Sequence, residues 1–303
     1  MNRRVFLQNT AFLSTLAGAS TVLPMPSSAQ ESAKSKTDRL HIAVNQYTAN
    51  SFFRRDEKNF WDELATLKSC GIDGFEATIG TAEEAENVGK RLKDAGLEMR
   101  SVYVGGSLHE KEHADKTIER ILATAEKTKE FGTQFMIYNP APKGGKSDEE
   151  LIRQTKKVDE LGAKLRGMGI TLSFHYHTTE LEFGGREFHH LLCGTDPANF
   201  TLCMEQHWSY RACGNSQVAL FDHIKLYSSR IATTHLRQSI DNVWSEWYGD
   251  GDIDSKRLAA ELKKLPKLPH IVLEQASEKG TPHTMTSADV FKKSVAYIRA
   301  IFS

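Results

Sequence analysis

The sequence predicts a (β/α)8 barrel, the TIM barrel, built as a single domain from residues 40–303. Eight short apolar runs, rich in β-branched and aromatic residues, alternate with amphipathic helical patterns, which is the order of a parallel sheet whose strands are joined by helices. The expected strand ends recur roughly every 30 to 40 residues, and barrels of this type usually have about 250 residues. An open doubly wound sheet is the alternative, but no phosphate-binding glycine fingerprint follows the first strand.

The predicted strands are short and apolar, as buried strands usually are. In chain order they lie in HIAVNQYT (41–48), GIDGFEAT (71–78), EMRSVYVGG (98–106), TQFMIYNPA (133–141), ITLSFHYH (170–177), FTLCMEQHW (200–208), RIATTHLRQ (230–238) and HIVLEQ (270–275). Three of the helical patterns between them end at a glycine, the residue that most often terminates a helix. These glycines are Gly71, Gly96 and Gly132.

The beginning of the chain differs in character from the barrel sequence. Residues 1–29 carry Arg3 and Arg4, then a mildly apolar stretch, then small residues near Ala29, which is the order of an export signal. The paired arginines followed by VFL look like a twin-arginine signal; a buried amphipathic helix is the alternative. Residues 30–39 are polar and lack periodicity, which predicts a flexible spacer. We therefore expect a periplasmic or otherwise exported protein.

Composition argues against several classes of partner. Lys and Arg together number 39, as do Asp and Glu, and no basic stripe with interleaved aromatic residues indicates binding to nucleic acid. No uninterrupted apolar window reaches about 18 residues, so we expect no membrane span after signal removal. A homo-oligomer is compatible with the sequence. An exported protein could pair its cysteines, but no CxxC spacing occurs and we expect buried free thiols at Cys70, Cys193, Cys203 and Cys213.

The last four predicted strands end in polar residues that are costly to bury alone. A barrel brings the C-terminal ends of its strands to one face, where barrel enzymes place their active sites. Buried carboxylates and imidazoles cost several kcal/mol unless they are paired or bind a metal. One divalent cation would satisfy three carboxylates and one imidazole drawn from these strand ends, which carry His175, His177 and Glu180, then Glu205 and His207, then His235 and Arg237, and finally Glu274. Such an oxygen-rich site favours Mn²⁺ or Mg²⁺, with Mn²⁺ first and Co²⁺ or Zn²⁺ as alternatives.

In their order along the chain, these motifs resemble the sugar phosphate isomerase/epimerase superfamily, the xylose isomerase-like TIM barrels. FHYHTTEL resembles the family pattern YHNHxxEF, MEQHW resembles LDxxW, and RIATTHLRQ resembles RIxxxHLKD. WYGDGDID is similar to the GeGdiD segment of the family, and HIVLEQ is similar to its last-strand pattern xxxvEq. The resemblance covers roughly residues 40–303 and implies that the metal ligands are Glu180, Glu205, His235 and Glu274.

The sequence departs from the family pattern at three places. Glu205 stands where Asp is usual, so this ligand is one methylene longer. In an alternative alignment to a DxxH variant of the strand, Met204 replaces the aspartate and His207 could be a ligand; we favour Glu205 because Trp208 then stays in register. Arginine and glutamine replace lysine and aspartate in HLRQ, and arginine binds oxyanions in a bidentate way that lysine does not.

The resemblance also implies the roles of the site residues. In the family, the metal holds a hydroxyl and a carbonyl oxygen of a sugar, and it stabilises the enediolate that forms when a carbon-bound proton leaves. Glu180 and Glu274 are then the catalytic acid–base pair. Residues expected to bind the sugar are His177, His207, Trp208, Arg237 and Trp247.

The sequence thus predicts a metal-dependent isomerase or epimerase. Phosphorylated sugars are mainly cytoplasmic, so an exported protein more plausibly acts on a free or oxidised (keto) carbohydrate. A lyase or hydrolase of 3-keto-glycosides would use the same site, because the same enolate can expel a neighbouring leaving group. A non-catalytic sugar-binding barrel is a further alternative, motivated by the departure at Glu205. The related endonucleases need extra metal ligands and a basic face, which we do not find in the sequence.

Overall fold

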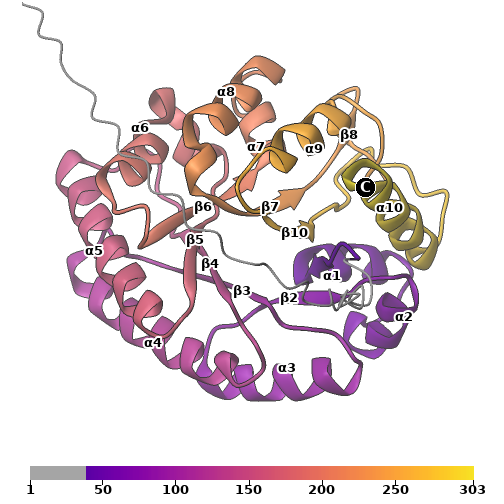
Figure 1. The fold of residues 1–303 in the computed structure, drawn as a ribbon, viewed down its shortest axis with the longest axis horizontal. Coiled ribbons are helices and arrows are strands. Elements are labelled where there is room, and N and C mark those ends of the chain that lie inside the picture. Colours follow the sequence, from indigo (N-terminus) through magenta and orange to yellow (C-terminus); the bar gives the residue numbers. More distant parts are fainter. Residues whose placement is uncertain (1–38) are drawn as a thin grey trace, which may run out of the picture. The chain divides into compact units, whose positions relative to one another are not determined.

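The computed structural model describes residues 39–303 (Figure 1). The predicted export signal, residues 1–29, and all but the last residue of the predicted spacer lie outside the described residues. Within the described part, no helix is both long enough and apolar enough to cross a membrane. All four cysteines fall in this part and are free thiols, as predicted, but only Cys70 and Cys203 are buried; Cys213 is half-buried and Cys193 is exposed.

Eight parallel strands close into a barrel in the order β1-β10-β7-β6-β5-β4-β3-β2, which confirms the predicted fold. The last strand closes the ring against the first through pairs such as Val44 with Leu273. The strands lie within the eight predicted runs: β1 (Ile42–Asn45), β2 (Gly74–Thr78), β3 (Ser101–Gly106), β4 (Phe135–Pro140), β5 (Thr171–Phe174), β6 (Phe200–Glu205), β7 (Ile231–Leu236) and β10 (His270–Leu273). A separate antiparallel hairpin after β7 is formed by β8 (Ser239–Ile240) and β9 (Val243–Trp244).

The helices surround the strands (Figure 1). They are α1 (Gln46–Arg55), α2 (Leu64–Ser69), α3 (Ala82–Asp94), α4 (Lys111–Lys129), α5 (Asp148–Gly167), α6 (Thr178–Gly194), α7 (Gln206–Arg211), α8 (Gln217–Tyr227), α9 (Ser255–Lys263) and α10 (Ser287–Phe302), with short 3-10 turns η1 (Phe60–Glu63) and η2 (Ser228–Arg230). Their apolar faces and the outer faces of the strands form one continuous core. This core holds the strand ends at fixed positions, which is what a site built from several strands needs.

Local chemistry explains where several helices begin and end. At the start of α5, the Ser147 hydroxyl accepts the N–H of Glu150, and the Glu150 carboxylate accepts the N–H of Ser147, forming a capping box. The three predicted terminating glycines follow α2, α3 and α4, and each has a positive φ that other residues adopt at a cost. The φ angles are 91° at Gly71, 70° at Gly96 and 91° at Gly132.

The interior of the ring is polar toward the C-terminal ends of the strands. The hydroxyls of Ser173 and Thr233 lie 3.1 Å apart, although β5 and β7 are not neighbours in the barrel, so both side chains point into the ring. Alternate residues of a strand share a face. His175 and His235, each two residues further along, therefore also face inward, and Glu205 is paired directly with His235 in the strand register.

Candidate active site

His235, near the C-terminal end of β7, lies at the centre of a buried group of carboxylates. Its Nε2 is 3.0 Å from Oε1 of Glu76, and its Nδ1 is 2.9 Å from Oε1 of Glu205 and 3.4 Å from Oε1 of Glu274. Burial lowers the pKa of His235, but Cys203 and the three carboxylates outweigh it, so the pKa lies well above its ordinary value. With these partners the imidazole is positively charged at neutral pH.

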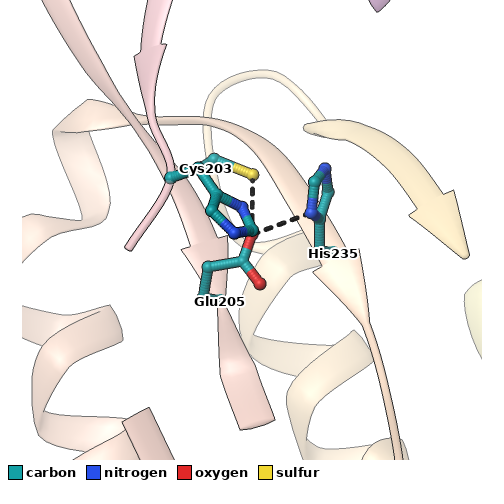
Figure 2. Close-up of side chains that lie close together, drawn as sticks. Cys203, Glu205 and His235 are labelled. Carbon is teal, nitrogen blue, oxygen red and sulfur yellow. Dashed lines mark hydrogen bonds and ion pairs between the residues drawn. The ribbon is translucent and has the colours of Figure 1, made fainter. Parts of the chain in front are cut away.

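Two more side chains approach the Glu205 carboxylate, one from β6 and one from the end of β5. His175 places Nδ1 2.7 Å from Oε1 of Glu205, and the thiol of Cys203 donates to that oxygen at 3.3 Å. In Figure 2, Cys203 and His235 are both directed at the Glu205 carboxylate. The donor atoms of these four residues lie within 4.8 Å of one another, and all four residues are buried. We call His175, Cys203, Glu205 and His235 the donor cluster.

The polar atoms of this region lie close together, but several of them lack a hydrogen-bond partner. Among the described residues, Nδ1 of His175, both ring nitrogens of His235 and both carboxylate oxygens of Glu76 are buried without a partner in good hydrogen-bond geometry. Buried polar atoms in that state call for an ion or an ordered water molecule. Imidazole, carboxylate and thiol are also the donor types that divalent transition metals accept in proteins. The residues present therefore fit a divalent metal at this place.

Glu274, immediately after β10, lies between the donor cluster and the mouth of the barrel. Its Oε2 is 2.9 Å from Nη2 of Arg237, and its Oε1 accepts from the side-chain amide of Asn45 at 3.0 Å. Arg237 also donates from Nε to the Glu274 carbonyl at 2.9 Å, which fixes the two residues together. Burial raises the pKa of Glu274, but the charges of Arg237 and His235 prevail and hold it below its ordinary value. Glu274 is therefore an ionised carboxylate at neutral pH.

A pocket of about 440 Å³ opens directly over Glu274. Pockets that bind small molecules usually measure about 300–1,000 Å³ and combine aromatic walls with a few placed polar groups. This pocket has that character, with four aromatic side chains and one ion pair. It is lined by Asn45, Tyr47, Thr78, Tyr103, His177, Trp208, Arg237, Trp244 and Glu274.

Trp244, on the short hairpin strand β9, is a firmly held wall of the pocket. The guanidinium of Arg237 lies 4.1 Å from its ring centroid and that of Arg211 lies 5.4 Å away. Arg211 makes two hydrogen bonds to Glu278, at 2.9 and 2.8 Å, and Glu278 accepts the backbone N–H of Trp244 at 2.8 Å. Cation–π contacts and this ion pair hold the ring in place before any ligand binds.

Comparison with known proteins agrees with this architecture. The sequence matches the xylose isomerase-like TIM barrel family over residues 64–301. The chain belongs to this family. No curated protein matches the sequence.

Solved structures share the fold at low sequence identity. A sugar phosphate isomerase/epimerase from Parabacteroides distasonis is 18% identical with a TM-score of 0.69, covering 91% of this chain and 98% of that one. A 3-keto-D-glucoside 4-epimerase from E. coli is 15% identical with a TM-score of 0.64, covering 86% and 99%. A D-allulose 3-epimerase from Methylomonas sp. is also 15% identical with a TM-score of 0.64, covering 87% and 98%.

Three of the four predicted metal ligands of this xylose isomerase-like barrel come together, and the fourth does not. Glu205 and His235 belong to the donor cluster, and Glu274 contacts His235 from the pocket lining, whereas Glu180 belongs neither to the cluster nor to the lining. Its Oε2 accepts the backbone N–H of His177 at 2.7 Å in the first turn of α6. Burial raises the pKa of Glu180 above its ordinary value. From the end of β5, the donor cluster receives His175 rather than Glu180.

Some of the predicted sugar-binding residues line the pocket, and others do not. His177, Trp208 and Arg237 line the pocket. His207 is buried beside Trp208 rather than in the lining, and burial together with Arg237 lowers its pKa to about 3. Trp247 packs on Lys293 and Tyr297 of α10, away from the pocket lining.

Met204 and Glu205 point to opposite sides of the sixth strand. Met204 is fully buried and its sulfur accepts from the Tyr176 hydroxyl, whereas Glu205 points into the ring. His207 is the second residue of α7 and does not join the donor cluster. The structure therefore agrees with the alignment that favours Glu205. The departure at Gln238 is also explained, because its amide donates to the carbonyls of Gly249 and Ile253 and holds the WYGDGDID segment.

Several residues of the site were not among the predicted ligands or sugar-binding residues. Asn45 ends β1, and Glu76 lies beside it within β2. Both reach the group from the half of the barrel whose motifs are generic. Cys203 was expected only as a buried thiol. The available signal was the two-residue alternation along each strand, which places Cys203 with Glu205 and places His175 at the level of His235.

Proposed function

We propose that this protein is a divalent-metal-dependent sugar isomerase or epimerase that acts on a free or oxidised (keto) sugar. The proposal rests mainly on the position of Glu274, which belongs to the pocket lining and also contacts His235 of the donor cluster. A base at the floor of the pocket is thereby placed next to a candidate metal centre. Membership of the xylose isomerase-like family and the fold shared with sugar epimerases support the same reading.

The reaction begins with removal of a proton from a carbon next to the sugar carbonyl. The Glu274 carboxylate is ionised at neutral pH and takes this proton. Arg237 donates hydrogen bonds toward sugar oxygens, and the rings of Trp208 and Trp244 cover the apolar faces of the sugar. A divalent metal held by His175, Glu205 and His235 would supply Lewis-acid stabilisation of the negative charge that develops on the sugar.

The pocket contains fewer carboxylates than the predicted acid–base pair requires. Among its lining residues, all of which the structure describes, Glu274 is the only carboxylate, because Glu180 caps α6. We therefore propose that Glu274 itself returns the proton, and that His177 donates a hydrogen bond to a sugar oxygen. Burial, together with His175, lowers the pKa of His177 to about 4, so its ring is neutral at pH 7.

The same observation favours a second candidate function, a lyase of 3-keto-glycosides. Elimination needs one base for the carbon-bound proton and one acid for the leaving group, not two carboxylates on opposite faces of the sugar. Glu274 would be the base, and its carboxyl, once protonated, would be the acid for the leaving group. The fold shared with a 3-keto-D-glucoside 4-epimerase motivates this class of substrate. The predicted twin-arginine signal adds the proposal that the protein is exported and meets non-phosphorylated sugars.

Both candidates are tested by incubating the metal-loaded protein with free sugars, 3-keto-sugars and 3-keto-glycosides in D₂O. Deuterium in the recovered sugar supports isomerisation or epimerisation, and release of the aglycone supports elimination. We expect Glu274→Gln to slow either reaction at least about 10³-fold, as is typical for loss of a general base placed against its substrate. Glu180→Gln is the matched control and should keep most of the activity.

Chelation followed by metal addition tests the dependence on metal in the same assay. We expect EDTA to abolish the reaction and a divalent metal to restore it. A metal-loaded protein that neither exchanges deuterium nor releases an aglycone with any of these substrates would contradict both enzymatic functions. That result would favour the non-catalytic sugar-binding barrel.

A further inference from the structure

Cys203 has no part in the proposed reaction, yet its thiol lies inside the donor cluster. It precedes Glu205 by two residues on β6, so the two side chains share the inward face. Cys203 is fully buried, and its Sγ is 3.3 Å from Oε1 of Glu205. A buried free cysteine is usually a small apolar residue of the core. Here its close neighbours include the Glu205 carboxylate and the His235 imidazole.

We propose that Cys203 is a sulfur ligand of the metal, completing a set of two imidazoles, one carboxylate and one thiolate. This inference rests on the metal dependence of the proposed function and specifies the ligands of that metal. Thiolate and imidazole favour zinc, cobalt or another borderline metal over Mn²⁺ and Mg²⁺, which prefer oxygen. The metal class therefore differs from the one that the sequence predicts from three carboxylates.

The distances are compatible with one ion. Four ligands at about 2.0–2.1 Å for nitrogen and oxygen and about 2.3 Å for sulfur place the donor atoms of a four-coordinate zinc about 3.3–3.6 Å apart. The donor atoms of His175, Cys203, Glu205 and His235 already lie within 4.8 Å of one another. Shifts of about an ångström or less in side-chain position would suffice, and the buried strands bring the donors together without any loop movement.

The same ligand set leaves Glu274 free for chemistry. Glu274 is held by Arg237 and Asn45 and lines the pocket, whereas Cys203 does not. A metal bound by the donor cluster would need no oxygen from Glu274, so the base keeps its lone pairs for the substrate. On binding, the S–H bond of Cys203 and one N–H bond of the charged His235 ring break, and both protons leave to solvent. Sulfur–metal and nitrogen–metal bonds form, with no change in oxidation state.

Cobalt is the probe that distinguishes a sulfur ligand, because thiolate-bound Co²⁺ gives an intense near-ultraviolet charge-transfer band. The full chain is stripped with EDTA under reducing, anaerobic conditions, titrated with Co²⁺ and followed by absorption and by equilibrium dialysis. We expect the band to saturate at about one cobalt per chain. The band should be absent in Cys203→Ser and in Cys203→Ala. It should persist in Cys70→Ser, which changes another buried thiol that hydrogen-bonds to the Ala288 carbonyl.

The affinities give a second readout that is independent of catalysis. Cys203→Ser should weaken Zn²⁺ binding at least about tenfold and Mn²⁺ binding much less, because only the soft ligand is lost. Wild-type protein that binds Co²⁺ without the charge-transfer band would overturn the role of Cys203 and leave a metal-dependent enzyme intact. Failure to bind Co²⁺, Zn²⁺ or Mn²⁺ at all would overturn the metal dependence as well. The decisive spectrum is that of the wild type. The proposal can therefore be overturned even if a variant does not fold.

Discussion

The two ends of the barrel both bury histidines, but they hold them in opposite states of charge. At the N-terminal end, His270 begins β10, accepts or donates a 3.1 Å hydrogen bond with the Ser101 hydroxyl and stacks on Phe135. Burial, reinforced by His41 and Arg100, lowers its pKa to about 3. The ring is therefore neutral throughout the physiological range.

At the C-terminal end, His235 is more deeply buried than the half-buried His270, yet its pKa is raised. The difference lies in the neighbours: two carboxylates lie within about 3 Å of His235, whereas His270 faces a hydroxyl and an aromatic ring. Burial alone therefore does not decide the charge of these histidines. The C-terminal end concentrates charge that the fold itself does not need, and this concentration indicates a functional site.

The largest expected effect comes from removing the charged ring at the C-terminal end. His235→Gln leaves Glu76 and Glu205 buried without their cation, and we expect it to lower the free energy of unfolding by about 3–5 kcal/mol in the presence of EDTA. His270→Gln removes one neutral hydrogen bond and should cost about 1 kcal/mol. Urea denaturation of both variants at pH 7 measures the contrast. Equal losses would show that the two ends do not differ in the way proposed.

The stability of the protein at acidic pH provides a second test, which concerns the neutral state of His270. The pKa of His270 is about 3 in the folded protein and about 6.5 in the unfolded chain, so the unfolded state binds an extra proton between these values. Its contribution to stability is complete above pH 6.5 and is lost as the pH falls. Between pH 7 and pH 5 this single histidine should account for about 2 kcal/mol of destabilisation.

The measurement compares the wild type with His270→Gln at both pH values. The variant lacks the titrating ring, so its free energy of unfolding should fall by about 2 kcal/mol less than that of the wild type over this interval. Groups that titrate at the C-terminal end are common to both proteins and cancel in the difference. Parallel losses would mean that His270 is not held neutral by the fold.

Much of the fold could be predicted because its signals are local. Alternating apolar runs and helical patterns gave all eight strands of the barrel, and Gly71, Gly96 and Gly132 marked helix ends correctly. The later half of the site was also within reach of the sequence, since Glu205, His235 and Glu274 each lie at the end of a strand. Their meeting follows from the closure of a parallel barrel.

The part that could not be predicted depends on where the fifth strand stops. β5 ends at Phe174 and α6 begins at Thr178, so the ring contains His175, whereas Glu180 falls in the first turn of the helix. A difference of a few residues in a strand end exchanges an imidazole for a carboxylate in the site. Glu76 and Asn45 were missed because a single polar residue in or at the end of a strand forms no motif. Their partners, His235 and Glu274, are recognisable only in the folded barrel.

The smallest expected effect is the loss of stability on changing Glu180, which we compare with Glu205 at the same end of the barrel. Its carboxylate is buried like that of Glu205, but it accepts a backbone N–H at the start of α6, whereas Glu205 contacts two imidazoles and a thiol. Glu180→Gln keeps an acceptor oxygen at the helix start, so we expect a loss of about 1 kcal/mol or less in urea denaturation. Cobalt affinity should be unchanged.

Glu205→Gln is the matched variant, because it makes the same chemical change at a proposed ligand. Changing residues that only support a metal ligand typically costs about 10–100-fold in affinity, so loss of the ligand itself should cost at least as much. Equilibrium dialysis with Co²⁺ on both variants measures the contrast. If Glu180→Gln weakened cobalt binding as much as Glu205→Gln, the helix start would have to rearrange to bring Glu180 to the metal, and the ligand set predicted from the sequence would replace the donor cluster.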